Sequence, residues 1–351
     1  MKAWPMIRTT NKEKLFPLVV LLIFFSGGLC LGLPPETTRI AFGSCANQNQ
    51  PLPILRDITA IEPEFTILLG DNVYLNRLAP ARIEREYAKL TSLADFAKLR
   101  EGSRILAIWD DNDYGLPDTG KENSFKASSK EAFLEFISAP PDDIRRTRNG
   151  IYDSILFGPP EKRGQIILLD TRWFRDPLTR NLKGDGYVPG ANQAATILGA
   201  EQWRWFEEQL NVPAKVRVIA SSIQVIADEH RFEKWANFPK ERQRLLDLIA
   251  ASSGLTLIIS GDRHHAEISK IALSSRRDLY EITASSFNQP REPGEEQNRY
   301  RVGVRYMLPN FGAIEIDWGQ FEPRVKAQIV ALGGESVTQI TASLLLESDT
   351  P

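Results

Sequence analysis

The chain has 351 residues, of which 42% are hydrophobic and 25% are charged, and this balance excludes both an intrinsically disordered protein and a small disulfide-stabilised domain. Lys and Arg together number 43 against 45 Asp and Glu, which gives a net charge of −2 and argues against nucleic acid as the main partner. Because the chain contains only three histidines, a metal site would also have to use carboxylate, phenolate or thiolate ligands.

The N-terminus has the order of a signal peptide. Residues 1–14 carry four basic side chains and one acidic side chain, residues 15–25 are apolar, and small residues follow. We therefore expect residues 1–32 to be removed during export to a periplasmic or secreted location, which leaves a single domain over residues 33–351. The alternative is an uncleaved N-terminal membrane anchor, because residues 15–33 approach the roughly 20 that span a bilayer.

From residue 38 onward, short apolar runs alternate with amphipathic stretches, which is typical of an α/β protein with buried strands. The predicted strands are Arg39–Phe42, Phe65–Leu69, Ser103–Trp109, Gly164–Leu169, Val216–Ala220 and Leu255–Ser260. The predicted helices are Ala81–Leu99, Ser128–Ile137, Ala200–Gln209 and Lys240–Ala251. Alternation with a period of two predicts antiparallel strands over Leu279–Ser286, Gly312–Trp318 and Arg324–Ala331. Two long polar loops, Phe174–Ile197 and Phe287–Arg301, are candidates for the rim of a site.

Chemically active side chains directly follow five of the predicted strands, and the carboxyl ends of strands are where open α/β sheets carry their ligand sites. The candidate ligands in and near these segments are Cys45, Asp71, Tyr74, Asp110, Asp111, Asp113, Asp262, His264 and His265. So many carboxylates would repel one another, and one or two cations are the simplest remedy. Thiolate, phenolate and imidazole suit a transition metal, whereas the additional carboxylates suit a hard divalent ion.

Each of these residues also has a plain structural interpretation. Gly70-Asp71 is compatible with an ordinary turn, Cys45 with a small buried apolar residue, and Tyr74 with a half-buried aromatic residue. His264 and His265 are harder to explain in this way, because they place two of the three histidines directly after the most hydrophobic predicted strand.

The combination of motifs is more specific than any one of them. The motifs are Phe42-Gly43-Ser44-Cys45, Leu69-Gly70-Asp71-Asn72-Val73-Tyr74, Trp109-Asp110-Asp111-Asn112-Asp113-Tyr114-Gly115, Leu169-Asp170-Thr171-Arg172, Trp235 to Pro239, Ser260 to Glu267 and Phe311 to Trp318. Together they resemble the alkaline phosphatase D (PhoD-like) family of calcineurin-like metallophosphoesterases over about residues 39–318. The resemblance implies a two-sheet β-sandwich flanked by helices in four αββα layers. It also implies hydrolysis of a small phosphoester, a monoester or a diester, by a metal-activated hydroxide.

Position by position, the resemblance implies that Cys45, Asp71, Tyr74 and His264 bind Fe³⁺. Asp71 would bridge to a second ion, Ca²⁺ or alternatively Mn²⁺, Mg²⁺ or Zn²⁺, which Asp111 and Asp262 share. Asp110 is expected as a supplementary ligand, and Asp113 and His265 as residues that orient the ligands.

One departure from the family pattern concerns catalysis. The family's acidic motif commonly reads Asp-Asp-His-Asp, and its histidine is suited to assist the leaving group, whereas this chain has Asn112. An amide donates a hydrogen bond but delivers no proton. The expected catalytic residues are Asn112, His265, Arg172 and Arg263, the two arginines as contacts to phosphate, although Arg172 could equally anchor a carboxylate. The alternative function is a metal-binding pseudoenzyme or a phosphate-binding protein with reduced turnover.

Overall fold

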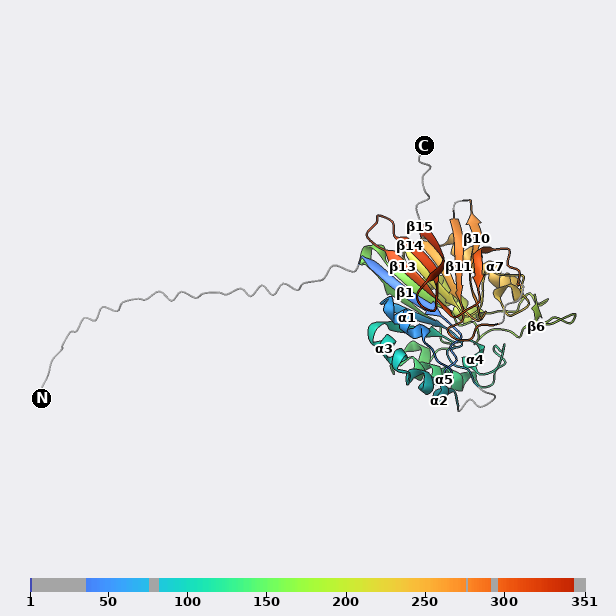
Figure 1. Cartoon of the computed structure of the whole chain (residues 1–351), viewed down its shortest axis with the longest axis horizontal. Helices are drawn as coiled ribbons and strands as arrows, with labels where there is room; N and C mark the ends of the chain where they lie inside the picture. The colour runs from blue at the N-terminus through green and yellow to red at the C-terminus, as the bar shows by residue number, and fades with distance from the viewer. Residues whose placement is uncertain (2–35, 76–81, 276, 292–295, 344–351) are drawn as a thin grey trace, which may run out of the picture. The chain divides into compact units, whose positions relative to one another are not determined.

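The computed structural model describes residues 1, 36–75, 82–275, 277–291 and 296–343 (Figure 1). The predicted leader lies outside the described residues, apart from Met1. All the helices and strands below belong to one unit, Pro34–Pro351. Among the described helices, none is both long and apolar enough to cross a lipid bilayer.

The first large sheet has six strands in the order β15-β14-β13-β1-β2-β3. They are β1 (Thr37–Gly43), β2 (Phe65–Leu69), β3 (Arg104–Ile108), β13 (Asn310–Asp317), β14 (Arg324–Ala331) and β15 (Ser336–Ser343). Strands β1, β2 and β3 run parallel to one another, whereas β13 pairs antiparallel with β1, with Ile40 opposite Ile314. The parallel arrangement places the carboxyl ends of β1, β2 and β3 at one edge of the sheet.

The second large sheet has seven strands in the order β12-β10-β11-β9-β8-β5-β4. They are β4 (Asp153–Phe157), β5 (Gly164–Leu168), β8 (Val216–Ser221), β9 (Leu255–Ser260), β10 (Ala266–Ser274), β11 (Arg277–Ala284) and β12 (Arg301–Tyr306). Its central strands β5, β8, β9 and β11 are parallel, and the outer pairs are antiparallel. The short strands β6 (Thr179–Arg180) and β7 (Tyr187–Val188) form a separate hairpin.

The two sheets share a hydrophobic core. One cluster of buried side chains includes Ile40 and Ile67 from the first sheet together with Ile166 and Leu257 from the second. The neighbouring strand residues, such as Ile167, point to the opposite face and join a second cluster. This alternation is the period-two pattern of a strand that is buried on both faces.

Helices cover the outer faces of the sandwich. Their bounds are α1 (Ile54–Ala60), α2 (Ile83–Thr91), α3 (Ala94–Gly102), α4 (Asp111–Tyr114), α5 (Lys126–Phe136), α6 (Gly199–Leu210) and α7 (Pro239–Ala251), with 3₁₀ turns η2 (Ile144–Arg146), η3 (Pro160–Lys162) and η4 (Trp235–Asn237). Trp203 of α6 and Leu245 of α7 pack on the seven-stranded sheet, whereas α1 and α3 contact strands of the six-stranded sheet. The predicted two-sheet sandwich flanked by helices is therefore confirmed.

The prediction of a single helix over residues 81–99 is wrong. The structure has two helices, α2 and α3, because Leu93 between them adopts an extended backbone with φ −67° and ψ 128°. The apolar periodicity continues across this break, since Ile83, Leu90 and Leu99 all face the core. Periodicity alone therefore could not reveal the break.

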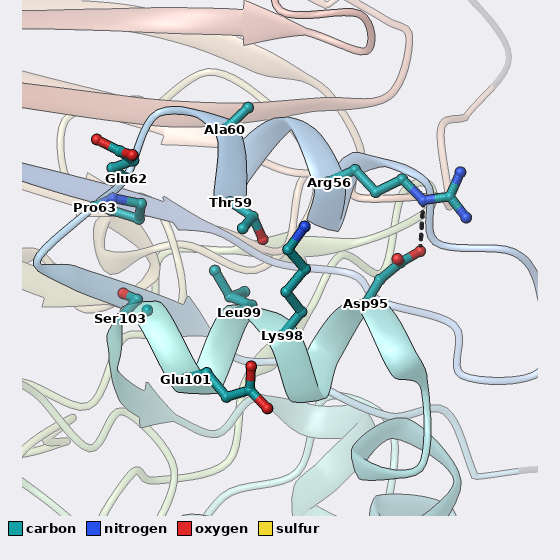
Figure 2. A pocket seen from close by; sticks show the side chains of 11 residues that line it. Arg56, Thr59, Ala60, Glu62, Pro63, Asp95, Lys98, Leu99, Glu101 and Ser103 are labelled. Atoms are coloured by element: carbon teal, nitrogen blue, oxygen red, sulfur yellow. Dashed lines mark hydrogen bonds and ion pairs between the residues drawn. The ribbon is translucent and has the colours of Figure 1, made fainter.

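A cavity of about 800 Å³ lies between α1 and α3 (Figure 2). Arg56 and Asp95 form an ion pair across it, with Nε and Oδ2 2.9 Å apart. Pro63 and Ser103, which precede β2 and β3, also line it. The cavity is thus at the amino ends of these strands, whereas the candidate ligands follow their carboxyl ends.

Candidate metal centre

Strand direction brings the candidate ligands together. Cys45, Asp71 and Asp110 follow β1, β2 and β3 at the same edge of the six-stranded sheet, and Asp262 and His264 follow β9 of the other sheet. A β-bridge between Ser44 and Ser285 joins the loops after β1 and β11. The carboxyl ends of the parallel strands in both sheets therefore meet at one place.

The backbone at this place is unusual. Cys45, Asp71, Asp262 and His264 have φ values of 58°, 51°, 67° and 57°, in the left-handed region that non-glycine residues seldom adopt. Gly70 is also required, because a Cβ atom there would lie 2.5 Å from the Cβ of Asp110. Clustered left-handed residues are typical of sites where function constrains the backbone.

A first group of donor atoms consists of the Cys45 thiol, the Asp71 carboxylate and the His264 ring, which lie within 4.8 Å of one another. The Tyr74 hydroxyl donates a hydrogen bond to Asp71 Oδ2 at 3.1 Å and so joins the group. The Nδ1 atom of His264 is hydrogen-bonded to the carbonyl oxygen of Gln289. This contact leaves Nε2 as the ring atom able to bind an ion.

A second group consists of the carboxylates of Asp71, Asp110 and Asp111, again within 4.8 Å. The Asp110 Oδ1 atom accepts hydrogen bonds from Arg172 Nε at 2.8 Å and from the Ser222 hydroxyl at 2.5 Å. The Oδ2 atom of Asp110 is buried and has no hydrogen-bond partner among the described residues. A buried carboxylate oxygen without a partner is unfavourable unless a cation occupies the adjacent space, so these residues fit a metal ion.

Burial and mutual repulsion dominate the electrostatics of the centre. Burial, reinforced by the charges of Asp111 and Asp110, raises the pKa of Asp71 well above its usual range. Burial also raises the pKa of Asp113 to about 7 and, although Arg263 opposes it, that of Asp262 to about 7. Without cations these groups favour bound protons, and metal binding would displace those protons.

Asp113 holds the surrounding backbone. Its Oδ1 accepts hydrogen bonds from the backbone N–H groups of Asp110 and Asp71, at 2.6 and 3.3 Å, and its Oδ2 accepts one from that of Asn72 at 3.2 Å. These bonds use both carboxylate oxygens. Asp113 therefore fixes the two loops that carry the ligands, and it is in neither donor group.

Asn112 lies beside both metal positions. Its backbone N–H donates to Asp71 Oδ1 at 3.2 Å, and its side-chain Nδ2 donates to Asp111 Oδ1 at 3.0 Å. The side chain is half-buried. Asn112 is thus next to the carboxylates of the second group. Its amide can donate a hydrogen bond there but has no proton to transfer to a leaving group.

The structure places the other predicted catalytic residues differently. Arg172 is fully buried and contacts Asp110 and Glu233, with 2.7 Å between its Nη1 and Glu233 Oε2. This geometry corrects the expectation of a contact to substrate and favours the alternative, in which Arg172 anchors a carboxylate. Arg263 pairs with Glu296 at 2.6 Å, and His265 Nε2 is 3.8 Å from the same residue.

Asp262 is a partial exception among the predicted ligands. It belongs to neither close donor group among the described residues, and the second group contains Asp110 in its place. Asp262 is nevertheless close enough to Asp111 for that charge to raise its pKa.

Several residues of the site escaped the sequence analysis. They are Ser222, Glu233, Arg175 and Gln289. Only Arg175 had a usable signal, because it follows Arg172 by three residues in the same loop. The others come from loops whose position depends on the packing of the second sheet.

We expect Arg172→Met to lower the free energy of unfolding by about 3–5 kcal/mol, because the buried Asp110 carboxylate loses its cationic partner and Glu233 keeps only Arg175. Arg244→Met is the matched control, since Arg244 pairs with Glu207 on the surface and its loss should cost less than about 1 kcal/mol. Urea unfolding of both variants measures the difference. Equal, small effects would show that the Arg172 network does not stabilise the fold.

Comparison with known proteins gives the same fold. The solved structure of a protein titled PhoD superposes with a TM-score of 0.68 at 16% identity, covering 88% of this chain and 72% of the other. A purple acid phosphatase from yellow lupin (Lupinus luteus) gives 0.59 at 11% identity, with 88% and 54% covered. A dimetal phosphatase from Danio rerio gives 0.51 at 9% identity, with 87% and 98% covered. No curated protein sequence matches significantly.

The family assignment rests on the sequence itself. The model of the PhoD-like phosphatase family matches residues 40–317, a range that contains both donor groups and most of the strands of both sheets. The resemblance noted from the motifs is therefore confirmed. The chain belongs to the PhoD-like phosphatase family and is a metal-dependent phosphoester hydrolase.

Proposed function

We propose that the protein hydrolyses small phosphoesters with two metal ions, Fe³⁺ at Cys45, Asp71, Tyr74 and His264, and Ca²⁺ at Asp71, Asp110 and Asp111 with Asp262 nearby. The observation that carries this proposal is the position of Asp71, the one residue present in both donor groups. A shared carboxylate is what a site for two adjacent ions requires. The soft and phenolate ligands all lie on the first side, which suits a transition metal there.

Bound metal ions would supply a nucleophile at neutral pH and neutralise the negative charge of the phosphoryl group. The residues of the chain provide the frame for this chemistry. Asp113 and Arg172 fix the carboxylates, and the Gln289 carbonyl fixes the ring of His264. Asn112 can donate a hydrogen bond to an ester oxygen without transferring a proton.

This last property defines the substrates that we propose. An ester whose leaving group is already a weak base needs little protonation, so aryl phosphates should be cleaved more readily than alkyl phosphates. The same property supports the second candidate, a metal-binding protein with low turnover. Neither candidate requires a nucleic-acid ligand.

Metal analysis combined with turnover assays separates the candidates. Purified protein should contain iron and a second metal, and should release phosphate from an aryl phosphate or cleave an alkyl diester. Metals without turnover on either substrate would favour the binding protein, and activity that survives complete removal of metal would overturn the proposed chemistry.

We expect the iron-loaded protein to be coloured, because phenolate and thiolate bound to Fe³⁺ give charge-transfer absorption in the visible range. Tyr74→Phe should shift or remove this band, and Cys45→Ser should lower the iron content, since a hydroxyl is a poor substitute for a thiolate. Tyr280→Phe is the control, because Tyr280 lies in β11 outside both donor groups. Absorption spectra and iron content measured on the same samples provide the test, and an unchanged band in Tyr74→Phe would exclude Tyr74 as a ligand.

We also propose export of the protein, on the basis of the N-terminal sequence. Fractionation of cells producing the full chain, with sequencing of the mature N-terminus, tests both export and cleavage near residue 33. An N-terminus at Met1 in the membrane fraction would support the anchor instead.

A further inference from the structure

A cavity of about 770 Å³ adjoins the metal centre. Arg263 and His265, in the loop after β9, line this cavity, whereas His264 between them belongs to the first donor group. The remaining lining residues come from the loop after β8, from the described residues Arg291, Glu296 and Gln297 between β11 and β12, and from the end of β12 and the residue after it, Arg305 and Met307. One short loop therefore contributes alternate residues to the metal centre and to the cavity.

Arginine side chains surround one aromatic ring in this cavity. The guanidinium carbons of Arg263, Arg291 and Arg231 lie 4.5, 5.0 and 5.1 Å from the centre of the Phe232 ring. Such contacts hold a guanidinium in place while leaving its N–H groups available at the edge. The three arginines are thus positioned before any ligand binds.

The charge of the lining is positive. Four arginines and two glutamates contribute to it, a formal charge of +2, and Arg231 also forms an ion pair with Asp185 outside the lining, with 3.2 Å between Nη1 and Oδ2. Both glutamates are engaged, since Glu296 pairs with Arg263 at 2.6 Å and Glu229 accepts a hydrogen bond from the backbone of Arg299 at 2.7 Å. Among the described residues, none forms an ion pair with Arg291.

A buried polar group adds an independent observation. His230 lines the cavity and is 5% exposed, and neither of its ring nitrogens has a hydrogen-bond partner among the described residues. The Nε atom of Arg263 is likewise buried and unpartnered. One ring nitrogen of a neutral His230 carries an N–H donor and Arg263 Nε carries another, and buried donors without acceptors are unfavourable unless a ligand supplies them.

We propose that this cavity is an anion subsite that binds a second phosphoryl group of the substrate, remote from the ester bond that is cleaved. The proposal rests on the proposed phosphoesterase function of the adjacent centre. An excess of arginine over acidic side chains favours an anion, and guanidinium groups bind phosphoryl oxygens through two parallel hydrogen bonds. The preferred substrates are therefore phosphoesters that carry another phosphoryl group at a fixed distance.

Titration calorimetry of the metal-loaded protein with alkane bisphosphonates of increasing chain length tests this subsite. These compounds are not hydrolysed, and each is compared with the alkylphosphonate of equal length. The bisphosphonate that spans the two sites should bind about 10- to 100-fold more tightly than the alkylphosphonate of equal length. A bisphosphonate advantage at no chain length, or an equal advantage at every length, would overturn the proposal.

Variants at exposed positions test whether the tighter binding of the bisphosphonate depends on this cavity. Arg291→Ala should remove most of the bisphosphonate advantage, and Arg291→Lys should restore it only in part, because lysine lacks the two-pronged geometry. Arg244→Ala is the matched control, since Arg244 also lies over an aromatic ring, that of Trp203, but does not line the cavity; it should keep the full advantage. An advantage that persists in Arg291→Ala would place the second phosphoryl group elsewhere.

A carboxylate-tipped alkylphosphonate distinguishes the chemistry of the anion. If this compound gains less affinity over the plain alkylphosphonate than the bisphosphonate does, the result supports a phosphoryl site. An equal gain in affinity would overturn that assignment. Because these measurements need no turnover, the subsite and the enzymatic function can fail separately. Length-dependent binding by an inactive protein would refute only the proposed activity, and activity without such binding would refute only the subsite.

Discussion

Asp71→Asn should abolish binding of both metal ions and lower turnover by more than about 1,000-fold. Asp71 contributes to both donor groups, and an amide has neither the charge nor the second anionic oxygen that a bridging position needs. His264→Ala should release only the ion of the first group, since His264 belongs to that group alone. Metal content measured by mass spectrometry, with turnover of an aryl phosphate on the same samples, checks both expectations.

Stability separates a metal ligand from a structural residue. Burial and neighbouring carboxylates raise the pKa of Asp71, so a neutral amide should be tolerated in the metal-free fold. We expect Asp71→Asn to unfold at the same urea concentration as the chelator-treated parent, and a much less stable variant would indicate a structural role. Asp142→Asn, at an exposed position in the loop after α5, should leave metals and activity unchanged.

The largest gain of activity is expected from Asn112→His. The Asn112 side chain donates to Asp111 Oδ1 at 3.0 Å, so an imidazole at this position would lie beside the second group with an ionisable proton. General-acid assistance is worth about 10²- to 10⁴-fold, and this is the range in which the rate on alkyl phosphates should rise. Aryl phosphates, which need no such assistance, should change little.

The measurement is the dependence of rate on the pKa of the leaving group in the parent and the variant. Parent rates should fall steeply as that pKa rises, and the slope should become shallower in Asn112→His. Asn112→Gln controls for the change in size, because it extends the side chain without adding an acid. A shallow slope in the parent would mean that another group already protonates the leaving oxygen. His265 is poorly placed for this task, since its Nε2 faces Glu267 and Glu296.

Sequence reasoning worked best for the buried parallel strands. Strands β2 and β9 begin and end at the predicted residues, because a strand covered on both faces has a mostly apolar sequence. The edge strand β15 was missed, since most of its side chains are at least partly exposed and its sequence is largely polar. Pairing between β1 and β13 joins residues 270 to 280 positions apart, and no local sequence pattern predicts such a contact.

The same division applies to the site. The motifs contain the residues of both donor groups because each residue lies within a few positions after a predicted strand. The parallel order of the strands brings these positions to one edge. The motifs did not indicate which carboxylate is held in place by hydrogen bonds from buried side chains, which in the structure is that of Asp110. That property depends on Arg172, Ser222 and Glu233, which lie in loops of the seven-stranded sheet, whereas Asp110 follows β3 of the six-stranded sheet. Contacts between loop residues that are far apart in the chain produce no local sequence pattern from which they could be predicted.

The left-handed backbone at Cys45, Asp71, Asp262 and His264 has a consequence for protein engineering. Each such residue costs roughly 1–2 kcal/mol relative to an unstrained one, so together they weigh against a net stability that is typically only about 5–15 kcal/mol. Glycine relieves this strain, and a selection for heat resistance alone would therefore favour glycine at these four positions. Thermostability and catalysis would be in direct competition at this site, and a stabilised variant is better sought in the sandwich core or at the exposed β15 edge.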